Sequence, residues 1–333
     1  MKRTLILLSI LVSHSAISQT LFPGGVAGNV AWWNFASLTP AVTSFNDVSG
    51  NNNNGTPFNL VSTSNFRGIS NKAMQFNGSG SYAIVPNSTT LQPQSISMVS
   101  VVKMDAYYTG SCQNSQILSK GSSSFSSGQF GLGVNDATYD NNNCATYFPN
   151  NMQLAVTYPS VNYTIGAGNY VSLNRWYFFA ISHNADTARF YQVEMDSSNY
   201  VSNLTPFFTA YNFGSPIGTS FEPLQIGRLD NTLYPYWFNG QMDELVLFNK
   251  ILNPNEMQDV YDFLWGKIVL ESVDPVICHG LPFVLNYKVG DHIPVGNVFS
   301  AQLSDMNGSF ANPTIIGTST SNTSGFTGLL LNA

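Results

Sequence analysis

The sequence predicts an all-β protein, a two-sheet antiparallel jelly-roll sandwich with one short C-terminal helix. Roughly a dozen short apolar or alternating segments are separated by turn clusters rich in Asn, Gly and Ser. Charged residues make up only 9% of the chain, whereas average globular proteins contain about 25%. Only one segment, residues 254–265, has the period of an amphipathic helix. Many short strands and a single helix favour a sandwich or jelly roll.

The expected strands follow one another between residues 30 and 248. The first, residues 30–35, is aromatic, and residues 73–77 and 82–85 are expected to form a hairpin around a Gly-Ser turn. The other expected strands are 96–104, 117–118, 130–134, 152–158, 176–182, 189–195, 224–227 and 243–248.

The expected helix has clear start signals. Asn253 is a capping residue, Pro254 suits the first helical position, and Glu256 stands where a capping box needs it. Its apolar face comes from residues spaced i, i+3, i+4 and i+7, namely Met257, Val260, Tyr261 and Leu264.

Residues 1–18 have the features of a secretory signal peptide. Lys2 and Arg3 precede an apolar stretch at 5–12 that is too short to span a bilayer, and small residues stand at the cleavage positions. The alternative is a buried N-terminal strand. No later run is long enough for a membrane span. We therefore expect a secreted or cell-surface protein whose jelly-roll domain occupies residues 20–267.

Charge and cysteine content limit the partners further. The formal net charge is −6 and no Lys/Arg cluster occurs, which argues against nucleic acid and anionic membranes as partners. Cys112 and Cys144 lie in one polar region, and an exported protein can oxidise them to a disulfide. Two free thiols are the alternative. Cys278 is left over, and the cysteine spacing fits no zinc site.

Six phrases in the sequence resemble, in order, the laminin-G-like domains of the concanavalin-A-like jelly-roll type. The phrases are WNF, DVSGNNNNGT, KAMQFNGSGSYAIVP, NRWYFFAISHN, LQIGR and FNGQMDELVLFNKILNPNEMQDVYDFLW. The resemblance extends from about residue 21 to residue 267. Residues 107–151 depart from it, because this region is long and Asn-rich and carries Cys112 and Cys144.

Residues 268–333 differ in character from the preceding domain. Their strand-like segments, 283–289, 298–303 and 314–317, resemble a β-sandwich module of large secreted proteins from Bacteroidetes-type bacteria. The segment is about half as long as such a module. We expect a truncated module, or a last segment that is poorly ordered, since half a sandwich leaves sheet edges uncovered.

One pair of acidic residues resembles a catalytic motif. Laminarinase-type glycosidases share the expected fold and carry Glu-x-Asp-x-x-Glu on one strand, where period-2 geometry puts the carboxylates on one face. Here the motif is Glu194, Asp196 and then Asn199, so the general acid is missing. Residues 196–199 also suit a hairpin turn. No catalytic residue is therefore assigned.

The loop around Asp47 is rich in oxygen ligands of the kind that Ca²⁺ prefers, because Ser49 and residues 51–54 follow it. In calcium-binding sandwiches that resemble this one, an early loop and the last strand share an ion. The resemblance therefore implies a structural calcium site formed by Asp47, Asn52, Asn54 and Asp243.

The alternative is that the Asn run only forms Asx turns and Asp243 accepts backbone N–H bonds. The loop is not an EF-hand. Asp136, Asp140 and residues 141–143 form a second, weaker cluster of the same kind.

Aromatic residues in apparent loops are candidates for ligand binding. Sugars stack their apolar faces on Tyr and Trp, and nearby amides bond the hydroxyls. Two groups qualify: Tyr107 and Tyr108, and Tyr234, Tyr236 and Trp237. The alternative for each group is packing against the rim of the sandwich.

Together these features predict a non-catalytic binding or adhesion module of an exported bacterial protein, with carbohydrate as the expected partner. The resemblance to the laminin-G-like domains carries this prediction. A glycoside hydrolase of the same fold and a purely structural surface spacer are the alternatives.

Overall fold

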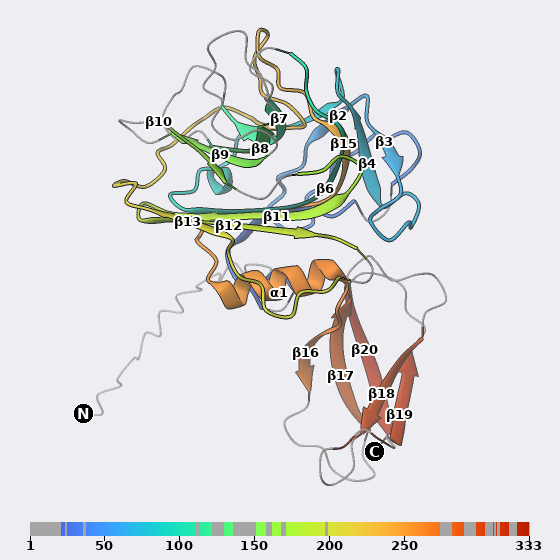
Figure 1. The fold of residues 1–333 in the computed structure, drawn as a ribbon. Coiled ribbons are helices and arrows are strands. Elements are labelled where there is room, and N and C mark those ends of the chain that lie inside the picture. Colours follow the sequence, from blue (N-terminus) through green and yellow to red (C-terminus); the bar gives the residue numbers. More distant parts are fainter. Residues whose placement is uncertain are drawn as a thin grey trace, which may run out of the picture.

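The computed structural model of the chain places two facing β-sheets above one helix (Figure 1). The described residues are 21–23, 25–35, 38–110, 114–121, 130–135, 151–157, 162–167, 171–196, 199–273, 282–289, 298–303, 309, 311, 314–319 and 325–332. The predicted signal peptide, the three cysteines and the cluster around Asp136 lie outside these residues.

The larger sheet has eight antiparallel strands. Their order is β13-β12-β11-β6-β15-β4-β3, and β1 pairs with β15. The bounds are β1 (Asn29–Trp33), β3 (Val61–Thr63), β4 (Ala73–Asn77), β6 (Ile96–Ala106), β11 (Trp176–His183), β12 (Thr187–Glu194), β13 (Phe208–Tyr211) and β15 (Asn239–Phe248).

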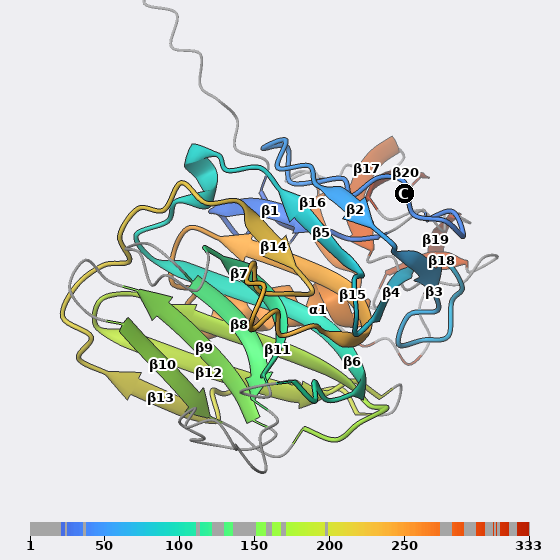
Figure 2. The same cartoon turned by 90° about the horizontal axis from the view of Figure 1, so that it is seen from above.

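The smaller sheet has seven antiparallel strands in the order β10-β9-β8-β7-β14-β5-β2 and lies over the first sheet (Figure 2). The bounds are β2 (Thr56–Phe58), β5 (Tyr82–Val85), β7 (Asn114–Lys120), β8 (Phe130–Asn135), β9 (Asn151–Thr157), β10 (Asn162–Ala167) and β14 (Leu224–Ile226). The predicted two-sheet antiparallel sandwich is confirmed.

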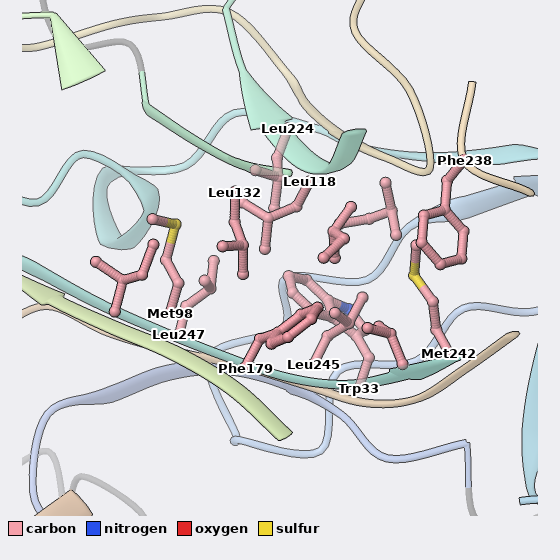
Figure 3. Close-up of a cluster of buried hydrophobic side chains, with 14 of the residues drawn as sticks. Trp33, Met98, Leu118, Leu132, Phe179, Leu224, Phe238, Met242, Leu245 and Leu247 are labelled. Carbon is pink, nitrogen blue, oxygen red and sulfur yellow. The ribbon is translucent and has the colours of Figure 1, made fainter. Parts of the chain in front are cut away.

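The core lies between the two sheets, because alternate residues of each strand point inward. Leu118, Leu132 and Leu224 come from the seven-stranded sheet and face Phe179 and Leu245 of the eight-stranded sheet (Figure 3). All five are fully buried. Each such side chain stabilises the fold by about 1.5–3 kcal/mol relative to an exposed one.

The helix α1 (Pro254–Trp265) covers the other face of the eight-stranded sheet (Figure 1). The Asn253 side chain accepts hydrogen bonds from the backbone N–H groups of Asn255 and Glu256, and the Glu256 carboxylate accepts one from the backbone N–H of Asn253, as a capping box requires. The helix ends at Gly266, whose φ of +97° is left-handed. The apolar stripe of α1 is buried as predicted, and the sheet therefore has two covered faces.

Strand β15 has two neighbours on one of its edges. Residues 239–242 pair with β4 and residues 245–248 pair with β1, while the opposite edge pairs with β6 and is bulged between Met242 and Glu244. The strand begins four residues before Asp243, so the prediction that Asp243 opens it is wrong. The apolar run at 245–248 marked only the end of the strand, although every residue from Met242 to Phe248 is buried.

One lysine lies inside the sandwich. Lys120, at the end of β7, is 1% exposed. Its Nζ donates to Asn87 Oδ1 at 2.7 Å and to the carbonyl oxygen of Glu222 at 2.6 Å. Burial lowers the pKa of Lys120 to about 8, and the nearby charge of Glu222 raises it only partly.

The chain continues after α1 as a small set of strands (Figure 1). Three of them, β16 (Val269–Val273), β17 (Pro282–Val289) and β20 (Gly325–Asn332), form one sheet, and β18 (Phe299–Leu303) pairs with β19 (Thr314–Ser319). The ring of Tyr287 in the three-stranded sheet lies 5.5 Å from the ring of Phe299 in the β18–β19 pair. That these strands are part of a larger sandwich module stays a prediction. Within the described part of the chain, no helix is long and apolar enough to cross a membrane.

Candidate functional site

The loop of residues 228–237, between β14 and β15, carries most of the predicted aromatic residues. Its base is closed by two backbone hydrogen bonds, from Gly227 to Ile117 at 2.8 Å and from Phe238 to Gly227 at 2.9 Å. Gly227 has a φ of +82°, and a Cβ there would lie 2.4 Å from the ring of Phe76. Only glycine fits, so the Gly-Arg step of the LQIGR phrase fixes where the loop leaves the sandwich.

Hydrogen bonds inside the loop hold its tyrosines. Asn231 Oδ1 accepts from the backbone of Leu233 at 2.7 Å and of Tyr234 at 3.0 Å, which is an Asx turn. The carbonyl of Tyr236 accepts from Gln116 N of β7 at 2.9 Å. Tyr236 has a left-handed φ of +46°, a conformation that costs a tyrosine about 1 kcal/mol or more and persists only where neighbours enforce it.

The two aromatic groups predicted from the sequence meet here. The ring of Tyr108, from the turn after β6, lies 6.0 Å from the ring of Tyr236 in an edge-to-face arrangement. The ring of Tyr234 lies 6.3 Å from the ring of Tyr236, and Tyr234 is 36% exposed. A Cβ on Gly110 would fall on the Tyr108 phenol, so the Tyr108 side chain folds back over this glycine.

Trp237 joins a second set of aromatic side chains at the edge of the seven-stranded sheet. Its ring lies 5.8 Å from Tyr82 of β5, and Tyr82 stacks on Phe58 of β2 at 4.5 Å. The guanidinium of Arg228 lies over the Tyr82 ring at 3.7 Å and 5.6 Å from the Trp237 ring. We call the two sets together the aromatic surface: Phe58, Tyr82, Tyr108, Arg228, Tyr234, Tyr236 and Trp237.

Tyr107 has a different position from its neighbour. Its hydroxyl donates to the carbonyl of Val171, and its ring packs against the core between the sheets. These contacts fit the packing alternative for Tyr107, so it does not belong to the aromatic surface.

Sequence reasoning missed three members of this surface. Phe58 lies in a strand too short to show alternation, and Arg228 was only part of a family phrase. Tyr82 gave a usable signal, since Ala83 and Val85 alternate with it and are buried, which puts Tyr82 on the outer face.

The predicted calcium ligand Asp47 is heavily hydrogen bonded. One carboxylate oxygen accepts from Trp32 N and Ser49 N, and the other accepts from Ser49 Oγ and Asn53 N, all at 2.8–2.9 Å. Asn54 Oδ1 accepts from Asp47 N at 2.8 Å. Asn52 is exposed and has a left-handed φ of +58°. These contacts are the Asx-turn arrangement that was the alternative to calcium.

The other predicted carboxylate ligand, Asp243, lies within β15. Trp32 of β1 donates its backbone N–H to Asp47 and pairs with Val246 of β15, so β1 connects the Asp47 loop to the last strand. Asp243 is fully buried at the bulge, and its neighbour Glu244 accepts a hydrogen bond from Trp32 Nε1 at 2.7 Å. Across the described ranges no three His, Cys, Asp or Glu side chains are grouped to hold a metal. A shared calcium ion stays a prediction, and it requires Asp47 to release some of its donors.

Glu194 and Asp196 stand at the end of β12. Glu194 forms an exposed ion pair with Arg175. Asn199 N donates to the carbonyl of Asp196 at 3.0 Å, which is the turn that the sequence offered as the alternative to a catalytic strand.

Comparison with known families decides the family of this fold. Residues 77–258 match the Laminin_G_3 family, described as the concanavalin A-like lectin/glucanases superfamily. The chain belongs to this family. The match runs from the end of β4 into α1, so this laminin G-like domain includes the whole aromatic surface except Phe58. No curated protein sequence matches the chain.

Several solved structures are similar in fold. Domain 4 of AbnA, an extracellular arabinanase from Geobacillus stearothermophilus solved with arabinotriose, is 15% identical, with 70% of this chain and 97% of that chain covered and a TM-score of 0.43. The sialidase of Trypanosoma rangeli, solved with sialic acid, is 16% identical, with 74% and 35% covered and a TM-score of 0.43. The binding domain of botulinum neurotoxin serotype D is 13% identical, with 92% and 93% covered and a TM-score of 0.47. Likeness at this level says nothing about the ligand of this chain.

Proposed function

We propose that this protein is a non-catalytic carbohydrate-binding module of an exported protein, and that the aromatic surface holds the sugar. One observation carries the proposal. Tyr108 and Tyr236, which are far apart in the sequence, lie 6.0 Å apart on a surface that the neighbouring Tyr234 extends into solvent. The family, whose description includes lectins and glucanases, is compatible with this function.

The chemistry of the surface suits a sugar. Aromatic faces stack on the apolar faces of pyranose rings, and hydroxyls of the tyrosines bond sugar hydroxyls. The loop that presents Tyr234 and Tyr236 is held by its Asx turn and by the hydrogen bond from Gln116. Binding a sugar therefore costs little conformational entropy in this loop. A turn at Asp196 in place of a catalytic strand supports binding over hydrolysis.

The test is a glycan array followed by calorimetric titration of the best ligand. We expect Tyr234→Ala to weaken that ligand about tenfold, which corresponds to one lost stacking contact of about 1.4 kcal/mol. Tyr211→Ala is the matched control, because Tyr211 is a 66% exposed tyrosine on β13 of the other sheet. Absence of binding to every glycan, or equal losses in both variants, overturns the proposal.

Calcium is tested separately with the same protein. If Asp47 and Asp243 share an ion, calcium raises the melting temperature and a chelator lowers it, because a ligand of the native state stabilises that state. An unchanged melting temperature in chelator would refute the calcium site and leave the carbohydrate proposal untouched.

A further inference from the structure

Arg228 brings a positive charge into the aromatic surface and is held in a fixed orientation. Its Nε donates to Gln225 Oε1 at 3.0 Å, and its guanidinium carbon lies 3.7 Å from the centre of the Tyr82 ring. The opposite face of Tyr82 is stacked on Phe58. Arg228 is therefore oriented by two independent contacts, one polar and one aromatic, before any ligand arrives.

Much of the donor capacity of Arg228 remains available. A guanidinium has five N–H groups. One is used by Gln225, and a second points to Asp230 Oδ1 at 3.5 Å, which is the outer limit of a hydrogen bond. Its side chain is 18% exposed and that of Asp230 is 49% exposed, so this contact lies at the solvent boundary.

Gln225 adds a second donor at the same place. It lies in β14 between the inward-facing Leu224 and Ile226, so its side chain is on the outer face of the sheet. Gln225 is 1% exposed, and its Nε2 has no hydrogen-bond partner among the described residues. Because Oε1 of the same amide accepts from Arg228, this Nε2 donor lies beside the guanidinium. A buried donor without an acceptor costs about 1–3 kcal/mol, and a ligand acceptor removes that cost.

From this geometry we propose that Arg228 and Gln225 form a carboxylate subsite within the aromatic surface, so that the module selects acidic glycans. The proposal rests on the proposed carbohydrate function and deepens it. The planar fork of arginine matches a carboxylate bidentately, and the Gln225 amide supplies a further donor to the same group. Trp237, whose ring lies 5.6 Å from the guanidinium, then contacts the ring of the sugar that bears the carboxylate.

Asp230 has a defined role in this arrangement. Its carboxylate contacts the guanidinium, and this long contact occupies the position that a ligand carboxylate would take. A sugar acid has to displace it. Removing the charge of Asp230 therefore strengthens the binding of acidic glycans, an effect opposite in sign to the loss of Arg228.

The test uses oligogalacturonate, oligoglucuronate and oligomannuronate, each compared with its own methyl ester, which keeps the sugar and removes the charge. Calorimetric titration with the full chain is expected to show at least one acid that binds about tenfold tighter than its ester, with a preference that falls at high salt. Arg228→Gln is expected to remove the preference, and Asp230→Asn to increase it several-fold. Arg175→Gln, at the ion pair with Glu194, is the control and leaves the preference unchanged.

The outcomes separate this inference from the proposed function. If esters and acids bind equally and Tyr234→Ala weakens both, the carbohydrate function stands and the carboxylate subsite is overturned. If no glycan of either kind binds, both fail. The melting temperature shows whether the Arg228→Gln variant folds. If it does not fold, the Asp230→Asn variant still tests the carboxylate subsite, because unchanged or weaker binding of the acid contradicts it.

Discussion

Two loops of the jelly roll use their polar side chains in opposite ways. In the loop after β1, the carboxylate of Asp47 accepts four hydrogen bonds from its own surroundings. In the loop of residues 228–237, Arg228 keeps donors at the solvent boundary and Gln225 holds a buried donor without a described acceptor. The first loop is internally satisfied and braces the fold. The second is satisfied only in part and is suited to a ligand.

The largest effect is expected when the Asp47 carboxylate is removed. Asp47→Ala leaves the N–H groups of Trp32, Ser49 and Asn53 without their acceptor, and we expect it to lower the free energy of unfolding by about 3 kcal/mol or more. Urea unfolding measures the change. Because the loop does not contribute to the aromatic surface, the folded variant should bind glycan as the wild type does. A neutral effect on stability would break the comparison.

A second test uses Lys120, whose ammonium group, like the Asp47 carboxylate, is hydrogen bonded inside the protein. Its acceptors are neutral: the Asn87 side-chain amide and a backbone carbonyl. Its pKa of about 8 in the folded state lies below the ordinary value of 10.5. Between these values the unfolded chain binds the extra proton, so the free energy of unfolding should rise with pH, by about 3 kcal/mol if the whole shift is realised.

The rise is to be read from urea unfolding between pH 8 and 10. Above that range tyrosines oppose it, since burial raises the pKa of Tyr261 to about 12 and the unfolded chain then loses protons first. Lys120→Met is the control, because its stability should show no such rise. An equal pH dependence in both proteins would show that Lys120 is not the group responsible.

Much of the fold follows from local sequence, and the reason is visible in particular elements. Helix α1 begins and ends where predicted, because its capping box, its proline and its apolar period are all within the segment itself. Strands β2, β3 and β13 are among those missed, because they are three or four residues long and have no fully buried side, so no alternation is visible.

The site was less accessible to sequence reasoning than the fold. Tyr234, Tyr236 and Trp237 could be selected as loop aromatics, but their meeting with Tyr108 depends on where Gly227 and Phe238 close the loop. Whether Asp47 bonds a metal or its own backbone depends on donors from β1, which local composition does not reveal. Pairing between distant segments decides both.

The most direct measurement is hydroxyl-radical footprinting of the full chain with and without its best glycan ligand, read out by mass spectrometry at each tyrosine and tryptophan. We predict reduced oxidation of Tyr234 and Trp237 when the glycan is bound, with Tyr211 on β13 unchanged as the internal reference. Unchanged oxidation of Tyr234 and Trp237 under saturating glycan, or protection at Tyr211 instead, would contradict the aromatic surface as the binding site.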